Sequence, residues 1–165
     1  EGLSRAILEE KEKGFKGIYK TNRMTNYLGS WIKHSGWYPD WKERIFSTED
    51  AQWEGEYVHE TLAFDGNIEV KELPGFLEHY SYVSFEDHRQ RADKYSRLTA
   101  QKMHAKGKKA SVLKPVLSAT ARFITMYLLK LGFLDGIMGF HIARISAASN
   151  FFKYAELRRL NQGNE

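Results

Sequence analysis

The chain of 165 residues is long enough for one domain with a hydrophobic core and too short for us to expect two large domains. Its 42% hydrophobic and 14% aromatic residues, with only three prolines, argue against a disordered chain. It contains no cysteine, which excludes disulfides and thiolate chemistry, and its net charge is +4.

The positive charge is concentrated in the second half of the sequence. Residues 1–83 carry 10 Lys and Arg against 15 Asp and Glu, whereas residues 84–165 carry 15 against 6. This asymmetry predicts that the second half meets an anionic partner, either nucleic acid or a membrane surface.

The first element expected along the chain is an amphipathic helix over residues 3–13. Leu3, Ile7 and Leu8 lie on one helical stripe and the charged residues lie elsewhere. Gly14 follows and is a natural end for this helix.

Residues 15–83 have the texture of short strands and loops. They are rich in aromatic and β-branched residues, which partly alternate with polar ones, and Gly, Asn and Asp interrupt them. Asp65-Gly66 predicts a tight turn between two strands, with residues 67–73 as the return strand. Residues 77–83 form one more expected strand.

A long helix is expected after residue 83. Ser84 and Asp87 stand at the spacing of a capping box, in which side chains satisfy the first free amides of a helix. The pattern continues to about Lys106, and Gly107 ends it.

Two further helices are expected in the last third of the chain. Ser111 is a candidate cap for the first of them, with Pro115 tolerated in its first turn and an end near Gly132. The other is expected from about Asp135 to Leu160.

These last helices are unusually apolar, but polar residues interrupt them too often for a simple membrane span. A basic, aromatic-rich helical pair lying in the plane of a membrane surface fits better, and an ordinary buried core is the alternative. Nucleic-acid binding fits less well, because the cations alternate with bulky aliphatic residues. The interrupting residues are Lys114, Arg122, Lys130, Asp135, His141 and Arg144.

An aromatic loop at residues 36–41 is a candidate ligand site. Flat rings such as those of Trp37 and Tyr38 commonly stack on sugar rings, and Asp40 could accept hydrogen bonds from hydroxyl groups. The alternative is that these aromatics anchor the loop onto a core.

His59-Glu60 combines a metal-capable imidazole with a carboxylate that could act as a base. Neighbouring side chains of a strand point to opposite faces, so the two residues share one site only at a strand end or a bulge. The local alternative is a pair of solvated polar residues on a strand.

Taken in order, several segments resemble the C-terminal half of bacterial inverting glycosyltransferases of family 2, of the lipopolysaccharide-core β-1,4-glucosyltransferase type. The resemblance extends from about Gly17 to Leu160. The segments are Arg23 with Asn26-Tyr27-Leu28-Gly29, HSGWYPDWKERIF at 34–46, WEGEYVHETL at 53–62, LEHYSY at 77–82, Tyr95-Ser96, GFLDGIMGF at 132–140 and FFKYAELRR at 151–159.

The resemblance implies an α+β fold that is the C-terminal part of a GT-A, Rossmann-like enzyme. Residues 1–83 would be the acceptor side of the catalytic domain, and residues 84–165 a basic amphipathic helical region that associates with the membrane. Similar enzymes transfer a sugar from a nucleotide-sugar donor, with inversion, to a lipopolysaccharide-core glycan on the cytoplasmic face of the inner membrane. They use a divalent cation, Mg or Mn, in the full-length protein.

The family's N-terminal nucleotide-binding half, with its Asp-x-Asp-type motif, does not occur in this sequence. We therefore expect a fragment of a longer protein that cannot catalyse transfer alone. An apolar face left uncovered in such a fragment predicts possible self-association.

Site roles follow from the resemblance residue by residue. Glu60 falls where these enzymes place the base that deprotonates the acceptor hydroxyl, and His59 is the matching candidate metal ligand, although the two roles could be exchanged. Arg44 would stabilise a phosphate, or alternatively form an ion pair with a carboxylate. The residues expected to bind the acceptor are Trp37, Tyr38, Asp40 and Arg44.

A second hypothesis assigns the chain no catalysis. It would then be a membrane-associated or protein-interaction module whose apolar helices dock against a partner.

Overall fold

The computed structural model describes residues 2–55 and 61–163 and confirms the predicted α+β class. Its residues form two compact units, each made of two stretches of the chain: Glu1–Met24 with Pro39–His79, and Thr25–Tyr38 with Tyr80–Glu165. The predicted division assigns different roles to residues 1–83 and 84–165, and it stays a prediction.

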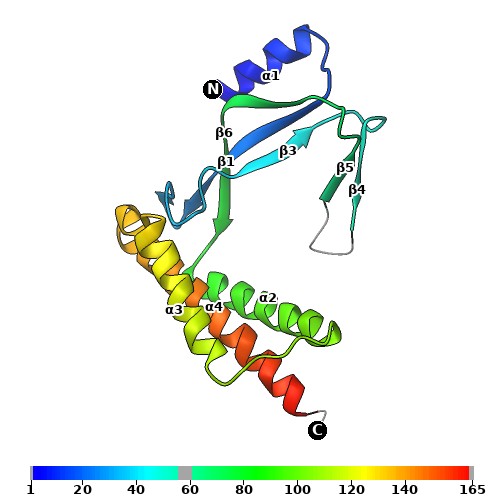
Figure 1. The fold of residues 1–165 in the computed structure, drawn as a ribbon. Coiled ribbons are helices and arrows are strands. Elements are labelled where there is room, and N and C mark those ends of the chain that lie inside the picture. The colour runs from blue at the N-terminus through cyan, green and yellow to red at the C-terminus, as the bar shows by residue number, and fades with distance from the viewer. Residues whose placement is uncertain (1, 56–60, 164–165) are drawn as a thin grey trace. The chain divides into compact units, whose positions relative to one another are not determined.

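The first unit combines one helix with two small antiparallel sheets (Figure 1). The first part of β1 pairs with β3, from Tyr19 opposite Ile45 to Asn22 opposite Trp41, and β6 also pairs with β1. A separate two-stranded sheet joins β4 and β5. The elements are α1 (Gly2–Glu12), β1 (Ile18–Tyr27), β3 (Trp41–Ile45), β4 (Ala51–Glu54), β5 (Thr61–Phe64) and β6 (Val70–Tyr82).

The core of the first unit lies where α1 packs against β1 and β6. Leu3, Ala6, Tyr19 and Leu73 are buried there. Leu8, on the predicted apolar stripe, is 59% exposed, whereas Ala6 is buried. The buried positions 3 and 6 are three residues apart, and a residue at position 8 lies farther round the helix.

The predicted turn after β5 is present, but it does not close a hairpin. The carbonyl of Asp65 accepts from the amide of Ile68 at 3.0 Å, and its side chain accepts from the amide of Asn67 at 3.0 Å. The strand before the turn pairs with β4, from Ala51 opposite Phe64 to Glu54 opposite Thr61, and β6 begins only at Val70. The expected return strand over residues 67–73 is therefore present only from Val70 on, as the start of β6, and it belongs to the sheet of β1 and not to that of β5.

The second unit is helical, with a short two-stranded addition (Figure 1). The end of β1 pairs with β2, with Asn26 opposite Trp31. Helix α4 packs against both α2 and α3. The elements are β2 (Ser30–Trp31), α2 (Phe85–Ala105), α3 (Lys114–Ile124), the π-helical turn η2 (Thr125–Leu129), the 3-10 turn η3 (Gly132–Asp135) and α4 (Gly136–Gln162).

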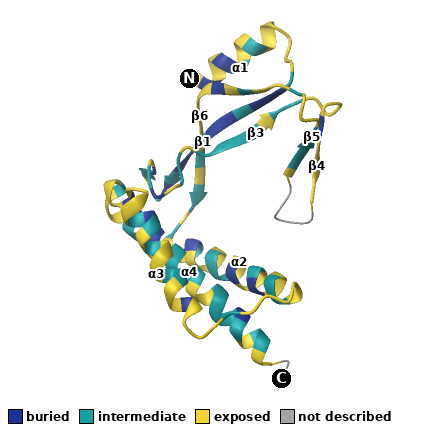
Figure 2. Cartoon of the chain, in the orientation of Figure 1, coloured by how far each residue is buried: buried dark blue, intermediate teal, exposed yellow. Residues whose placement is uncertain are grey.

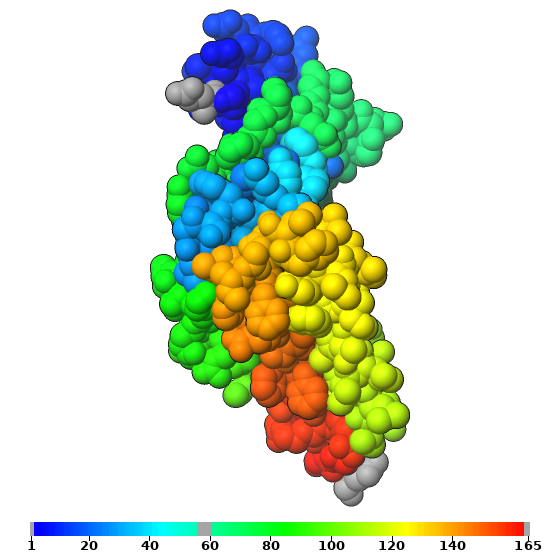
Figure 3. Space-filling model, turned by 90° about the vertical axis from the view of Figure 1, so that its left-hand side faces the viewer, coloured from blue at the N-terminus to red at the C-terminus, as the bar shows by residue number. Residues whose placement is uncertain are grey.

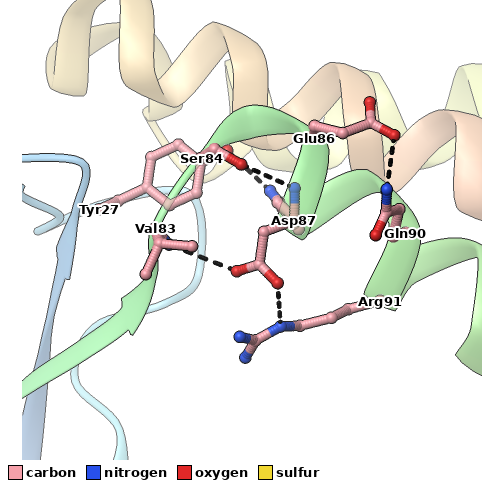
Figure 4. A network of polar contacts seen from close by, with 8 residues as sticks. Tyr27, Val83, Ser84, Glu86, Asp87, Gln90 and Arg91 are labelled. Atoms are coloured by element: carbon pink, nitrogen blue, oxygen red, sulfur yellow. Dashed lines mark hydrogen bonds and ion pairs between the residues drawn. The ribbon is translucent and has the colours of Figure 1, made fainter.

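The start of α2 confirms the predicted cap (Figure 4). The hydroxyl of Ser84 accepts from the amide of Asp87 at 3.0 Å, and the Asp87 carboxylate accepts from the amide of Val83 at 3.3 Å. The same carboxylate accepts from Arg91 one turn later at 2.7 Å. The helix ends before Gly107, which takes the left-handed conformation with φ +68°.

The starts of the other two helices agree with the prediction in part. Ser111 does not cap α3, which begins after Leu113 without a side-chain cap, although Pro115 is in its first turn as expected. Helix α4 begins after Asp135, as predicted, but the carboxylate of this residue makes no cap hydrogen bond. Leu131, between the two helices, is left-handed with φ +54°.

The core of the second unit joins residues far apart in the sequence. Tyr27, Ile32, Met126, Ile142 and Ala143 are all fully or almost fully buried in one cluster. They come from β1, the segment after β2, η2 and α4, so the cluster fixes these elements to one another.

Among the described residues, no single helix is both long and apolar enough to cross a membrane. The segment Lys114–Leu129 together with Gly132–Gln162 meets the criteria of length and composition as a pair, but the pair is bent by 71°.

Close approach at this bend makes Gly139 a testable position. A methyl group there would meet the carbonyl oxygen of Gly132. Alanine in a helix is favoured over glycine by about 1 kcal/mol, but forcing atoms into a packed core costs about 1–3 kcal/mol. We expect Gly139→Ala to lower the free energy of unfolding by about 1–2 kcal/mol in a denaturant titration. Gly66→Ala is the control, because nothing lies within 4 Å of the added methyl. A stabilised Gly139→Ala variant would contradict this packing.

Candidate functional site

The two residues predicted to carry the chemistry, Glu60 and His59, lie outside the residues that the structure describes. Their roles as base and metal ligand therefore stay predictions. In the chain they directly precede Thr61, the first residue of β5, which is paired with Glu54 of β4.

Trp37, predicted to bind the acceptor, packs against the core of the second unit. Its indole stacks on the ring of Tyr82 at 5.7 Å and meets the ring of Tyr27 edge-on at 5.7 Å. Both Trp37 and its neighbour Tyr38 are half-buried. This arrangement matches the alternative in which aromatics anchor the loop, and it leaves sugar stacking as a prediction for both residues.

Asp40, a second predicted acceptor residue, is bound by cations within the first unit. Arg23 donates to its Oδ2 from Nε at 2.8 Å, and the Nη2 of the same guanidinium lies 2.6 Å from that oxygen. The Nζ of Lys42 lies 3.1 Å from Oδ1. The backbone of Asp40 also joins β1, because its amide donates to the side chain of Asn22 at 3.0 Å. Asp40 thus fixes the start of β3 and positions Arg23.

His79 belongs to the same polar region of the first unit. Burial, and then the nearby charge of Arg23, lower the pKa of the His79 imidazole; Asp40 opposes the shift and Arg44 adds to it. The imidazole is therefore mainly neutral at pH 7 and can both donate and accept a hydrogen bond. We call Arg23, Asp40, Arg44 and His79 the first-unit polar group; it combines two guanidinium groups, one carboxylate and one neutral ring.

Sequence reasoning did not assign His79 a role in the site. The signal was present, because His79 stands in the LEHYSY segment at 77–82 that carries the family resemblance. Arg23 stands in another of these segments, and its contact with Asp40 spans 17 residues. The fork of Arg23 is already bound to Asp40, and guanidinium groups of this kind match carboxylate and phosphate oxygens in geometry.

A buried hydrogen bond between Tyr27 and His88 lies in the second unit. The hydroxyl of Tyr27 is 2.8 Å from Nδ1 of His88, and the two rings meet edge-on. Burial raises the pKa of Tyr27 to about 12 and lowers the pKa of His88 to about 4. Both groups are therefore uncharged at neutral pH, which is the form that a buried position favours.

Two of the segments that carry the resemblance meet at Asp135 in the second unit. The buried carboxylate accepts from the amides of Lys33 at 3.1 Å and His34 at 3.0 Å, and its Oδ1 lies 2.8 Å from Nδ1 of His34. Because a carboxylate only accepts, the imidazole is the donor. Next to this contact, the amide of Ser35 donates to the carbonyl of Lys130 at 2.9 Å. These bonds explain why Asp135 does not cap α4.

Within residues 2–55 and 61–163, no group of three or more His, Cys, Asp or Glu side chains could hold a metal ion. The divalent cation implied by the resemblance stays a prediction, and its expected ligand His59 lies outside those ranges.

No protein family model matches the chain, and no solved structure matches it significantly. A function for the chain can therefore be inferred only from the resemblance of its sequence and from the geometry of its described residues.

The Tyr27–His88 pair predicts a loss of stability in mild acid. The unfolded His88 takes up a proton near pH 6.5, whereas the folded one does so only near pH 4. Stability is therefore full above pH 6.5 and falls as the pH falls toward 4, by about 3 kcal/mol in all, since one pKa unit corresponds to about 1.4 kcal/mol.

Denaturant titrations between pH 4 and 7 measure this loss. We expect the dependence to be much weaker in His88→Asn, which cannot be protonated in this range, and to persist in the control His104→Asn. Equal pH dependence in the wild type and in His88→Asn would contradict the assignment.

Proposed function

We propose that this chain is the acceptor-side part of a family 2, GT-A glycosyltransferase that transfers a sugar with inversion to a lipopolysaccharide-core or similar glycan. The ordered segments of the sequence support the proposal. The observation that carries it from the structure is that residues of different segments pair: Arg23 with Asp40, and His34 with Asp135. Such pairing is expected of segments that serve one fold.

Glu60 is the proposed general base. An alcohol is a poor nucleophile, so the acceptor hydroxyl has to lose its proton as its oxygen attacks the anomeric carbon of the donor sugar. The proton goes to the carboxylate, the new glycosidic bond forms, and the bond to the nucleotide diphosphate breaks with its electron pair. Attack from the opposite face gives inversion in one step. A divalent cation, when bound, supplies charge that neutralises the departing diphosphate, with His59 as its proposed ligand.

The acceptor is proposed to meet Trp37, Tyr38, Asp40 and Arg44. Arg44 belongs to the first-unit polar group, which offers donors to sugar hydroxyls or to a phosphate on the glycan. Because Asp40 already binds Arg23 and Lys42, its proposed contribution is to hold the guanidinium of Arg23 in place as well as to accept from a hydroxyl.

The proposed partners are a nucleotide-sugar donor, a glycan or lipid-linked acceptor and an anionic membrane surface, with no nucleic acid. The proposed location is cytoplasmic and peripheral to the inner membrane, where a lipid-linked acceptor is reached without a spanning helix. The excess of cations in residues 84–165 supports an anionic surface as partner.

A second candidate function is a non-catalytic membrane-associated or protein-interaction module. The observation that favours it is that large apolar side chains are left exposed on α3 and η2, which could also lead to self-association. Figure 2 marks the exposed residues of the chain in yellow.

Replacing Glu60 in the full-length parent protein tests the catalytic proposal. We expect Glu60→Gln to lower the turnover of sugar transfer by about 10²-fold or more, because the amide cannot accept the proton. Binding of the nucleotide sugar, measured by calorimetry, should be retained. Glu49→Gln, a change at an exposed carboxylate of the first unit, is the control. Unchanged turnover in Glu60→Gln would remove this residue from the mechanism, and a parent without any transfer activity would favour the module.

A further inference from the structure

Large apolar side chains are exposed along α3 and η2, beginning at the residue before α3. Leu113, Leu117, Ile124 and Leu128 recur at helical spacing and are between 42% and 66% exposed; we call them the outer stripe. Figure 3 shows α3 and η2, coloured yellow-green to yellow, as a strip of surface beside the orange and red surface of α4.

The other side of the same segment is buried. Pro115 and Met126 are covered, and Met126 belongs to the core cluster with Ile142 of α4. The segment therefore keeps one side on the protein, while Val116 and Leu129, outside the outer stripe, are also exposed. A helix in this state suits a position in the plane of an interface, where one side meets hydrocarbon and the other remains on the protein.

Among the described residues, no carboxylate forms an ion pair with three cations of α3 and α4. The ammonium groups of Lys114 and Lys153 lie over the same ring, that of Tyr154, at 5.3 and 4.6 Å. Burial, the charge of Arg122 and that of Lys114 lower the pKa of Lys153. Lys114, Arg122 and Lys153, here called the basic flank, therefore repel one another, and an anion placed among them would relieve the repulsion.

Carboxylates are scarce in this part of the sequence, and Glu156, just beyond it, is bound by Arg159 at 2.8 Å. Residues 107–155 contain seven Lys and Arg and a single carboxylate, Asp135, which is already bound to the segment 33–34. A groove of about 290 Å³ also lies between the start of α3 and the end of α4. Its lining includes the apolar side chains of Val116 and Phe151 and the cationic ones of Arg158 and Arg159.

We propose that the outer stripe inserts into one leaflet of an anionic lipid membrane, with the basic flank bound to lipid phosphates. The apolar stripe and the unpaired cations lie on the same pair of helices, which is the combination that anionic lipid surfaces bind. The proposal rests on the membrane partner proposed above and not on sugar transfer. It assigns that role to α3 and η2 and excludes α2 from the inserted part.

The lack of cysteine permits a direct test with the chain as it is. Leu117→Cys, in the outer stripe, and Leu98→Cys, an exposed leucine of α2, each carry one environment-sensitive fluorophore. With phosphatidylcholine–phosphatidylglycerol vesicles we expect the label at 117 to shift its emission to the blue and to be protected from aqueous iodide. The label at 98 should show neither change. Equal responses at the two positions, or none at 117, would overturn the proposal.

Removing positive charges tests the role of the basic flank in binding lipid phosphates. Lys114→Gln with Arg122→Gln should weaken binding to the anionic vesicles about tenfold or more and reduce its dependence on salt, whereas Lys94→Gln with Lys102→Gln on α2 should have a smaller effect. If the chain bound neutral phosphatidylcholine vesicles as tightly as anionic ones, the proposed binding of the basic flank to lipid phosphates would be overturned.

A protein partner on the same surface would give a different result. If Leu117→Glu left vesicle binding unchanged but converted a dimer into a monomer in sedimentation, the outer stripe would be a self-association surface and the proposal would fail. Circular dichroism of each variant confirms that it is folded. Loss of transfer activity in Glu60→Gln of the parent leaves all these measurements unaffected, so the two proposals can fail separately.

Discussion

The arrangement of the second unit depends on the carboxylate of Asp135. This side chain is only 4% exposed, and an isolated charge at such a position is costly. Three N–H groups of Lys33 and His34 satisfy it, so the segment after β2 is held at the turn from which α4 starts. Removing the carboxylate would leave two backbone donors without their acceptor, and the turn would lose its attachment.

The close contacts around this attachment explain the course of the chain between α3 and α4. Leu131 takes a left-handed conformation that an ordinary residue adopts only at a cost, and Gly132 lets the backbone approach Ser35 and Met126. The bend that results places one side of α3 and η2 on α4. The other side remains apolar and exposed, beside cations that have no carboxylate among them. The same packing that stabilises the unit thus creates the surface for which we propose a lipid partner.

Local signals in the sequence predicted where helices begin and end better than they predicted which residues pack against one another. The cap at Ser84 and the end at Gly107 follow from rules that act within a few residues, and both are confirmed. The π-helical turn η2 has no such local signal, and the burial of Ala6 in place of Leu8 depends on the sheet that α1 meets. The structure also gives His79 and His88 neighbours that no spacing rule predicts, since Tyr27 and His88 are 61 residues apart. The catalytic roles of Glu60 and His59 come from the resemblance alone.

Hydrogen exchange at the amides of Lys33 and His34 tests the central claim most directly, because both amides donate to Asp135. In Asp135→Ala we expect these two amides to exchange faster, while amides in the middle of α2 keep their rates. Asn161→Ala, which removes a side-chain hydrogen bond to His104, is the control and should leave residues 33 and 34 unchanged. Unchanged exchange at both amides in Asp135→Ala would show that this carboxylate does not hold the segment, and would contradict the account.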